Sequence, residues 1–235
     1  MENRIAAGKG GFGLSNNQLK IIAMLSMLAD HMGMILFPEV RLLRIVGRLA
    51  FPIFAFMIAE GCAHTRNRGR YLLQMAAVAL VCQIGYAVAM GSLFQCVMVS
   101  FLLASLSIFS LENFRTKRDP LSFAGAAAMA LLVVGMTVIG PQLLRHRGFA
   151  VDYGFWGVML PVVVYFLPGH LWKCAGAALM LALLSHTLEP RQWFSLLAIP
   201  LLMLYNGRRG KWKLKYLFYI FYPAHLGILY LISFL

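Results

Sequence analysis

The chain has 235 residues, of which 61% are hydrophobic and only 12% are charged, and its mean hydropathy is +0.77. This composition excludes an ordinary soluble domain and predicts an all-α integral membrane protein. The net charge of +13 is concentrated in the short gaps between apolar runs, the pattern that orients membrane proteins, so we do not expect nucleic-acid binding. We expect one integral membrane domain, residues 1–235, built as a polytopic bundle of about nine transmembrane helices, some of them short or broken.

The expected helices follow the apolar runs of the sequence. Residues 1–17 are polar and lack the apolar core of a signal peptide, so we expect a cytoplasmic amino-terminal segment. The runs of 153–168 and 191–205 are short for a span. The nine runs cover residues 18–37, 44–63, 71–91, 94–113, 121–141, 153–168, 171–188, 191–205 and 213–234.

Lysine and arginine are concentrated in alternate gaps between the runs. The positive-inside rule then places the amino terminus in the cytoplasm and the carboxyl terminus outside, although Arg145 and Arg147 lie in a gap assigned to the outside. We therefore expect a multi-pass membrane protein with a cytoplasmic amino terminus.

The first run contains an ionisable pair, Asp30 and His31, which is expensive in hydrocarbon and therefore indicates a functional site. At about 100° per residue, Lys20 and His31 lie on nearly the same helix face, about 16 Å apart along the axis. His31 has the chemistry of a general base, whereas a packing histidine is the structural alternative. Asp30 points about 100° away from His31 and is expected to pair with an arginine.

Arginines recur around the start of the second run, at Arg41, Arg44 and Arg48, and the i, i+3, i+7 spacing puts them on one helix face. A guanidinium stays charged and needs an acid or a bound anion. Arg44 or Arg48 would either form a structural ion pair with Asp30 or stabilise an oxyanion. Arg48 stands four residues before Pro52.

Three further groups bear candidate residues. Glu60 and His64 are i, i+4 partners and form a structural or gating pair, since nothing supplies the remaining ligands of a metal site; we expect no metal. His225 lies near the middle of the last run, and Asp152 lies at the outer start of the sixth. We expect a cluster in the outer half of the membrane, above an inner ring of cations. The members of this outer-half cluster are Asp30, His31, Arg44, Arg48, Asp152 and His225.

Several sequence segments together resemble the TraX family, which is similar to the wider acyltransferase-3 group of membrane acyltransferases. In that group the first span carries a basic residue and, after ten residues, a histidine, the spacing of Lys20 and His31. The segments that carry the resemblance are Lys20-x-Ile-Ala…Asp30-His31, Arg44-Ile-Val-Gly-Arg48-Leu-Ala-Phe-Pro-Ile-Phe-Ala-Phe, Ala59-Glu60-Gly61…His64-Thr65-Arg66-Asn67-Arg68, Asp152-Tyr-Gly-Phe, Leu204-Tyr205-Asn206-Gly207 and Tyr219-x-x-Tyr222-Pro223-x-His225.

The resemblance implies transfer of an acetyl group from cytoplasmic acetyl-CoA to an extracytoplasmic hydroxyl or amine on a polysaccharide, lipid-linked or pilin-like acceptor. His31 would be the base or, alternatively, the acyl carrier, with Asp30, Arg44, Arg48 and His225 around it. The oligomeric state is left open. The cations expected to meet the CoA phosphates are Lys20, Arg66, Arg68, Arg70, Arg208 and Arg209.

Two other functions compete with acyl transfer. A proton-coupled small-solute transporter also uses intramembrane Asp, His and Arg, and broken helices suit it. No internal repeat of the kind common in transporters is visible in the sequence. A non-catalytic membrane scaffold is disfavoured by the number of ionisable groups within the runs.

Overall fold

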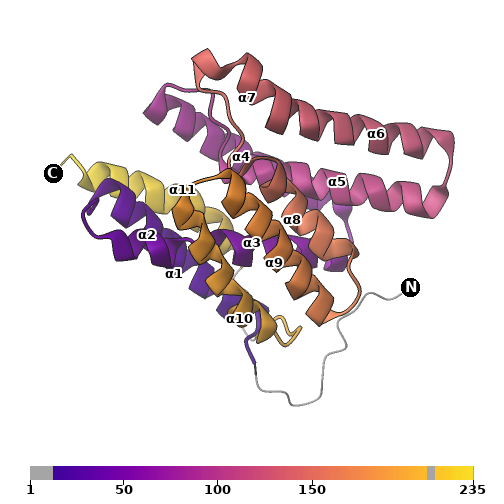
Figure 1. The fold of residues 1–235 in the computed structure, drawn as a ribbon, viewed down its shortest axis with the longest axis horizontal. Helices are drawn as coiled ribbons and strands as arrows, with labels where there is room; N and C mark the ends of the chain where they lie inside the picture. Colours follow the sequence, from indigo (N-terminus) through magenta and orange to yellow (C-terminus); the bar gives the residue numbers. More distant parts are fainter. Residues whose placement is uncertain (1–12, 211–214, 235) are drawn as a thin grey trace. The chain divides into compact units, whose positions relative to one another are not determined.

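The computed structural model describes residues 13–210 and 215–234, and all of its regular structure is helical (Figure 1). Most of the predicted amino-terminal segment, residues 1–12, lies outside the described residues. Each of the nine apolar runs contains a helix, which confirms the all-helical expectation. The helices in chain order are α1 (Asn16–Ile35), α2 (Arg41–Gly47), α3 (Ala50–His64), α4 (Arg68–Met90), α5 (Val97–Lys117), α6 (Pro120–Val134), η1 (Gly135–Ile139), α7 (Gly140–Leu143), η2 (Arg145–Arg147), α8 (Gly154–Phe166), α9 (His170–Thr187), η3 (Pro190–Leu197), α10 (Ala198–Met203) and α11 (Lys215–Ile232).

Four helical segments in the described part of the chain are long and apolar enough to cross a membrane. They are Arg41–His64, Arg68–Val88, Val97–Lys117 and Pro120–Leu143. Gly154–Phe166 and Ile220–Ile232 are apolar but shorter. By length and composition, the structure therefore supports a multi-pass membrane protein, with fewer clear spans than the nine expected from the sequence.

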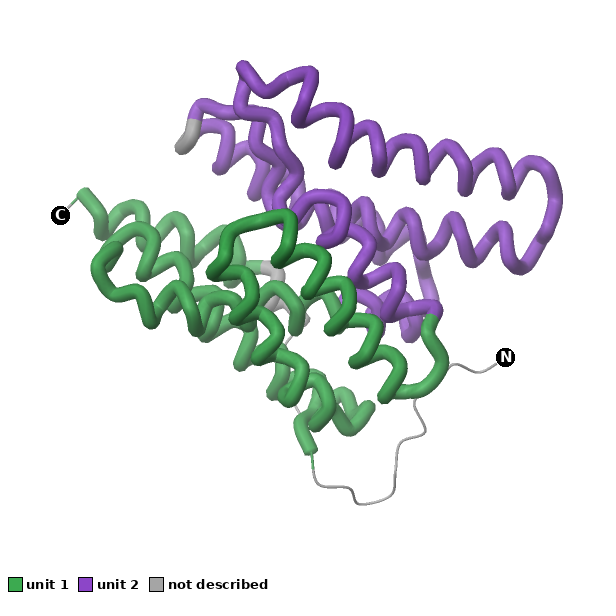
Figure 2. The backbone as a smooth tube through the Cα atoms, viewed as in Figure 1, with its two compact units in different colours: residues 1–57, 167–235 green, residues 58–166 purple. Residues whose placement is uncertain are grey.

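The chain divides into two compact units (Figure 2). Unit 1 contains residues 1–57 and 167–235, and unit 2 contains residues 58–166. In unit 1, α1 packs against both α2 and α11, while α9 packs against η3 and α10. In unit 2, α5 packs against α4, α6 and α8.

Unit 2 is held by an apolar core and by short local caps. Its core includes Leu103, Ile108 and Val158, all at most 5% exposed. Asp119 begins α6: its carboxylate accepts a hydrogen bond from the backbone N–H of Ser122 at 2.7 Å, which lowers the pKa of the Asp119 carboxyl.

The second apolar run is interrupted between α2 and α3. Pro52 has no N–H, so the carbonyl of Arg48 loses the donor it would have in a regular helix, and the proline ring crowds that carbonyl. The backbone tightens there: the N–H of Arg48 donates to Ile45 at 3.1 Å, and that of Leu49 donates to Val46 at 3.2 Å. The interruption therefore falls at Arg48, one of the predicted site residues.

Candidate active site

A partly buried ion-pair cluster joins α1 to α2. Arg44 Nη1 donates to Asp30 Oδ2 at 2.8 Å and to the Asp30 carbonyl oxygen at 3.2 Å. Arg48 Nη2 donates to Asp30 Oδ1 at 2.5 Å. The side chains are 16% exposed at Asp30, 17% at Arg44 and 12% at Arg48. The expected pairing of Asp30 is confirmed, with one carboxylate shared by two guanidinium groups.

Two glycines allow α1 and α2 to approach closely enough for this pairing. A Cβ atom at Gly47 would overlap the side chain of Asp30, and one at Gly33 would lie 2.8 Å from Leu43 Cβ. Small residues at helix contacts let the backbones come together in this way. Gly33 and Gly47 therefore position the carboxylate between the two arginines.

Arg48 extends the cluster to a third element. Its Nε donates to the carbonyl of Arg44 at 3.3 Å, and its Nη1 donates to Gln192 Oε1 on η3 at 3.3 Å. One guanidinium thus links α1, α2 and η3, all within unit 1.

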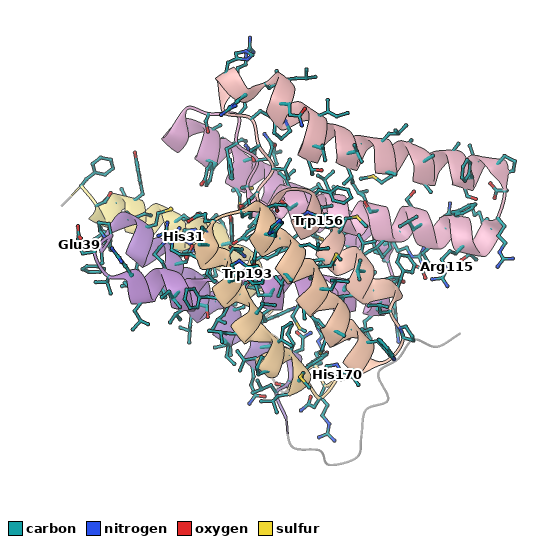
Figure 3. All side chains as sticks on the ribbon, viewed as in Figure 1. His31, Glu39, Arg115, Trp156, His170 and Trp193 are labelled. Atoms are coloured by element: carbon teal, nitrogen blue, oxygen red, sulfur yellow. The ribbon has the colours of Figure 1, made fainter. Side chains whose placement is uncertain are left out.

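His31 meets His225, a residue 194 positions away in the sequence. His225 Nε2 and His31 Nδ1 are 2.9 Å apart, and the ring centroids are separated by 4.9 Å. His225 is 4% exposed and stacks on Phe221 with an interplanar angle of 7°. The pair forms where α11 runs alongside α1, and Figure 3 labels His31 there.

The hydrogen bonds determine which ring nitrogens carry protons. His225 Nδ1 lies 2.7 Å from the carbonyl oxygen of Phe221, which only accepts, so this nitrogen carries a hydrogen. In a neutral His225, Nε2 is then the acceptor, and His31 Nδ1 is the donor. The lone pair of His31 Nε2 is therefore directed away from His225 and suits a general base.

The arginines differ in how many donors they commit. Both hydrogen bonds of Arg44 in the described residues start from Nη1, which leaves its Nε and Nη2 donors for a ligand. Arg48 uses Nε, Nη1 and Nη2 within the protein. His31 also interacts electrostatically with Arg44. Of the two arginines, Arg44 is better placed to bind an oxyanion.

A second group of predicted cations gathers at the start of α1. The backbone N–H groups of Asn16 and Asn17 donate to the carbonyls of Arg208 and Arg209 at 2.8 and 3.3 Å. Lys20, one turn further along, interacts electrostatically with Arg209. Arg208 and Arg209 are exposed, so this end of unit 1 presents positive charge.

The remaining predicted residues belong to unit 2. Arg68 Nη2 is paired with Glu112 Oε2 at 2.8 Å, whereas Arg66 and Arg70 are exposed. In the i, i+4 pair, His64 Nδ1 lies 2.8 Å from the Glu60 carbonyl and 3.8 Å from its Oε2. For Asp152, Ser100 Oγ donates to its carbonyl at 2.6 Å. Five members of the expected cluster lie together in unit 1, and Asp152 lies in the other unit.

Sequence reasoning missed Gln192, Ser195 and Lys173. Gln192 is uncharged, so a search for charged residues within the apolar runs did not select it. Two polar residues three apart in an apolar run, Gln192 and Ser195, were the signal that could have identified it. Lys173, which falls within the predicted run 171–188, was not singled out, yet its charged side chain is 3% exposed inside α9. Among residues 13–210 and 215–234, no three His, Cys, Asp or Glu side chains are grouped so as to hold a metal ion.

Comparison with known proteins defines the family. The model of the TraX protein family matches residues 15–233, which include every side chain of the cluster in unit 1. The chain belongs to the TraX family. The chain is also 27% identical over 240 residues to "Probable fimbrial assembly protein FimC, serogroup H1" of Dichelobacter nodosus, covering 90% of this chain and 93% of that protein.

A shorter similarity involves a protein without an assigned role. Over 38 residues, the chain is 47% identical to "Uncharacterized protein RP591" of Rickettsia prowazekii, covering 16% of this TraX-family chain and 15% of that protein. No solved structure matches the chain.

Proposed function

We propose that this TraX-family protein is a membrane-embedded acyltransferase that moves an acetyl group from cytoplasmic acetyl-CoA to an extracytoplasmic hydroxyl or amine. The observation that carries the proposal is the His31–His225 hydrogen bond beside the Asp30–Arg44–Arg48 cluster. An oriented imidazole next to uncommitted cationic donors is the arrangement that acyl transfer needs. The relation to the acyltransferase-3 group, stated above as a resemblance, is part of this proposal.

The chemistry follows from the tautomer of His31. The acceptor O–H or N–H attacks the thioester carbonyl carbon while His31 Nε2 takes its proton. The imidazolium keeps its Nδ1–H bond to His225, and Arg44 donors stabilise the oxyanion. When the intermediate collapses, the C–S bond breaks and His31 returns the proton to the CoA thiolate.

The geometry of α1 suits an extended acyl donor. Lys20, Arg208 and Arg209 would bind CoA phosphates at the start of the helix. Eleven residues of helix then separate Lys20 from His31, about 16 Å along the axis. A pantetheine arm reaches about this distance when extended. In unit 2, Arg66 and Arg70 remain proposed phosphate contacts, whereas the ion pair with Glu112 occupies Arg68.

We further propose that all nine helical runs cross or enter the bacterial cytoplasmic membrane, with the start of α1 on the cytoplasmic side. The alternate basic gaps support this orientation. Reporter fusions after α1 and after α11 test this orientation. Both fusions should report the outside of the membrane, whereas a fusion at the amino terminus should report the cytoplasm.

The acceptor class has one further line of support. The relative from Dichelobacter nodosus is named a probable fimbrial assembly protein. A pilin-like acceptor would agree with that name, and polysaccharide and lipid-linked acceptors remain within the proposal.

The test is release of thiol from acetyl-CoA by the protein purified in detergent. We expect slow release by the wild type and a loss of roughly 10²-fold or more in His31→Ala. His186→Ala is the matched control because His186 is exposed at the end of α9, and it should retain the activity. Absence of both CoA binding and His31-dependent thiol release would disprove the acyltransferase.

One observation favours a second function. Two hydrogen-bonded imidazoles can pass a proton, so His31 and His225 would also suit a proton-coupled transporter of small solutes. Solute counter-flow in proteoliposomes that depends on His31, without thiol release from acetyl-CoA, would support the transporter instead.

A further inference from the structure

Two polar side chains on η3 are buried in unit 1 without satisfying their hydrogen-bonding atoms. Gln192 is 2% exposed and Ser195 is 0% exposed. Within the described residues, Gln192 Nε2 and Ser195 Oγ have no hydrogen-bond partner. Burying a donor without an acceptor costs free energy, so such atoms in a folded protein call for an explanation.

The orientation of the Gln192 amide follows from its contact with Arg48. A guanidinium only donates, so the oxygen of the amide must face Arg48 Nη1, as the 3.3 Å contact to Oε1 shows. The NH₂ group is then held on the other side of the amide. Arg48 thereby fixes a buried NH₂ group whose two hydrogens have no acceptor among the described residues.

Ser195 shares a helix face with Gln192. In a 3-10 helix, residues three apart lie above one another, and η3 is of this type. Trp193 and Phe194, which lie between them, are 48% and 40% exposed, so the polar pair faces inward and the aromatic pair outward. Figure 3 labels Trp193 on this segment. Inward, η3 packs against α9 and α2.

The charge next to these donors favours an electron-rich ligand atom. Asp30 carries one negative charge against the two positive charges of Arg44 and Arg48, so the cluster has an excess positive charge. Gln192 touches this cluster directly through Arg48. The matching ligand is an oxygen with free lone pairs and a full or partial negative charge.

We propose that Gln192 Nε2 and Ser195 Oγ donate hydrogen bonds to a substrate oxygen in the acyl-transfer site. This assignment rests on the proposed acyltransferase function. The oxygen belongs either to the acetyl group of acetyl-CoA or to the acceptor. Arg48 has a positioning role: its guanidinium is held by Asp30 and in turn orients the Gln192 amide.

Three substitutions test the two hydrogen-bond donors separately from the Gln192 oxygen that accepts from Arg48. Gln192→Glu keeps an oxygen for Arg48 but replaces the NH₂ donor by a second oxygen, whereas Gln192→Met removes both. Ser195→Ala removes the hydroxyl alone. Ser107→Ala is the matched control: Ser107 is also buried, but its hydroxyl donates to the Leu103 carbonyl at 2.8 Å in its own helix.

Two measurements distinguish the source of the oxygen. The first is thiol release from acetyl-CoA into water, and the second is incorporation of radiolabelled acetyl groups into membrane vesicles from cells that express the protein. If the acetyl carbonyl is bound, Gln192→Glu lowers the kcat of thiol release by roughly 10²-fold and Ser195→Ala lowers it less. If the acceptor is bound, thiol release is unchanged and only label incorporation falls.

The experiment also distinguishes failure of the acyltransferase proposal from failure of the subsite proposal. A wild type without His31-dependent thiol release refutes both the acyltransferase and this subsite. An active wild type with Gln192 and Ser195 variants of equal activity refutes the subsite alone. If those variants differ from Ser107→Ala only in melting temperature, the two donors serve the fold and bind no substrate.

Discussion

The two units differ in the polar bonds that link their elements. In unit 2, the buried hydroxyls of Ser107 and Thr137 donate to carbonyls four residues earlier in the same helical segment, at 2.8 and 2.6 Å, whereas Ser100 donates to the distant Asp152 carbonyl at 2.6 Å. In unit 1, the polar groups bind partners on other elements: Asp30 on α1, Arg48 on α2 and Gln192 on η3 form one connected set. Local bonds satisfy a polar group without specifying a neighbour, whereas bonds between helices fix a geometry. This difference supports the proposal that the chemistry lies in unit 1.

Removing the shared carboxylate is expected to have the largest effect. Asp30→Ala leaves two partly buried guanidinium groups without their counter-ion, so it should lower the free energy of unfolding by about 3 kcal/mol, the lower end of the range for buried pairs, and abolish thiol release. The comparison in unit 2 is Glu112→Ala, which breaks an ion pair whose side chains are 30% and 49% exposed. That loss should be at most about 1 kcal/mol. The free energy of unfolding in SDS should be measured for both variants. Equal losses in the two would contradict the expected difference between the clusters.

A methyl group at the α1–α2 contact should have the next largest effect. Gly47→Ala places a Cβ against the Asp30 side chain and should destabilise the protein by about 1–3 kcal/mol. Gly85→Ala in α4 is the control, because a Cβ there meets nothing within 4 Å. It should be neutral or slightly stabilising, within about 1 kcal/mol. Equal melting temperatures for the two variants would show that the Gly47 contact is loose.

His225→Ala should reduce catalysis more than stability. It removes the partner that orients His31 and stabilises its imidazolium, a hydrogen bond whose loss costs about 1–1.5 kcal/mol, or about a tenfold decrease in kcat. KM for acetyl-CoA should change little, because His225 lies at the far end of α1 from the proposed phosphate site. Steady-state thiol release resolves the two parameters, and a change confined to KM would assign His225 to binding.

The smallest effect is expected from a hydroxyl that bonds its own helix. Thr137→Val keeps the shape of the side chain and removes a bond to the Val133 carbonyl. Such a bond competes with the backbone and contributes little, so we expect a change within about 1 kcal/mol and unaltered thiol release. A larger loss would mean that unit 2 also depends on specific polar bonds.

The sequence was sufficient for the features that depend on local pattern. The apolar runs predicted the helices. The position of Asp30 inside the first run, and the spacing of Arg44 and Arg48, predicted an ion pair between Asp30 and an arginine. Pro52 lies four residues after the break at Arg48, as the loss of a backbone donor requires.

Features that depend on which helices are neighbours were beyond the sequence. His31 and His225 were both singled out, but nothing in either segment indicates that α1 packs against α11. Gln192 was missed because its role depends on a contact with Arg48, 144 residues away. Asp152 belongs to unit 2, so its predicted place in the cluster stays a prediction.

The pairing of His31 with His225 has a consequence for biosynthesis. One imidazole is supplied by the first helix and the other by α11, and the start of α1 is also bonded to the carbonyls of Arg208 and Arg209. A ribosome makes these segments in order, so α1 is complete before almost every other helix has been made. His31 acquires its partner only when α11 arrives. A partly synthesised chain thus lacks the oriented imidazole, and the His31–His225 pair is among the last contacts to form.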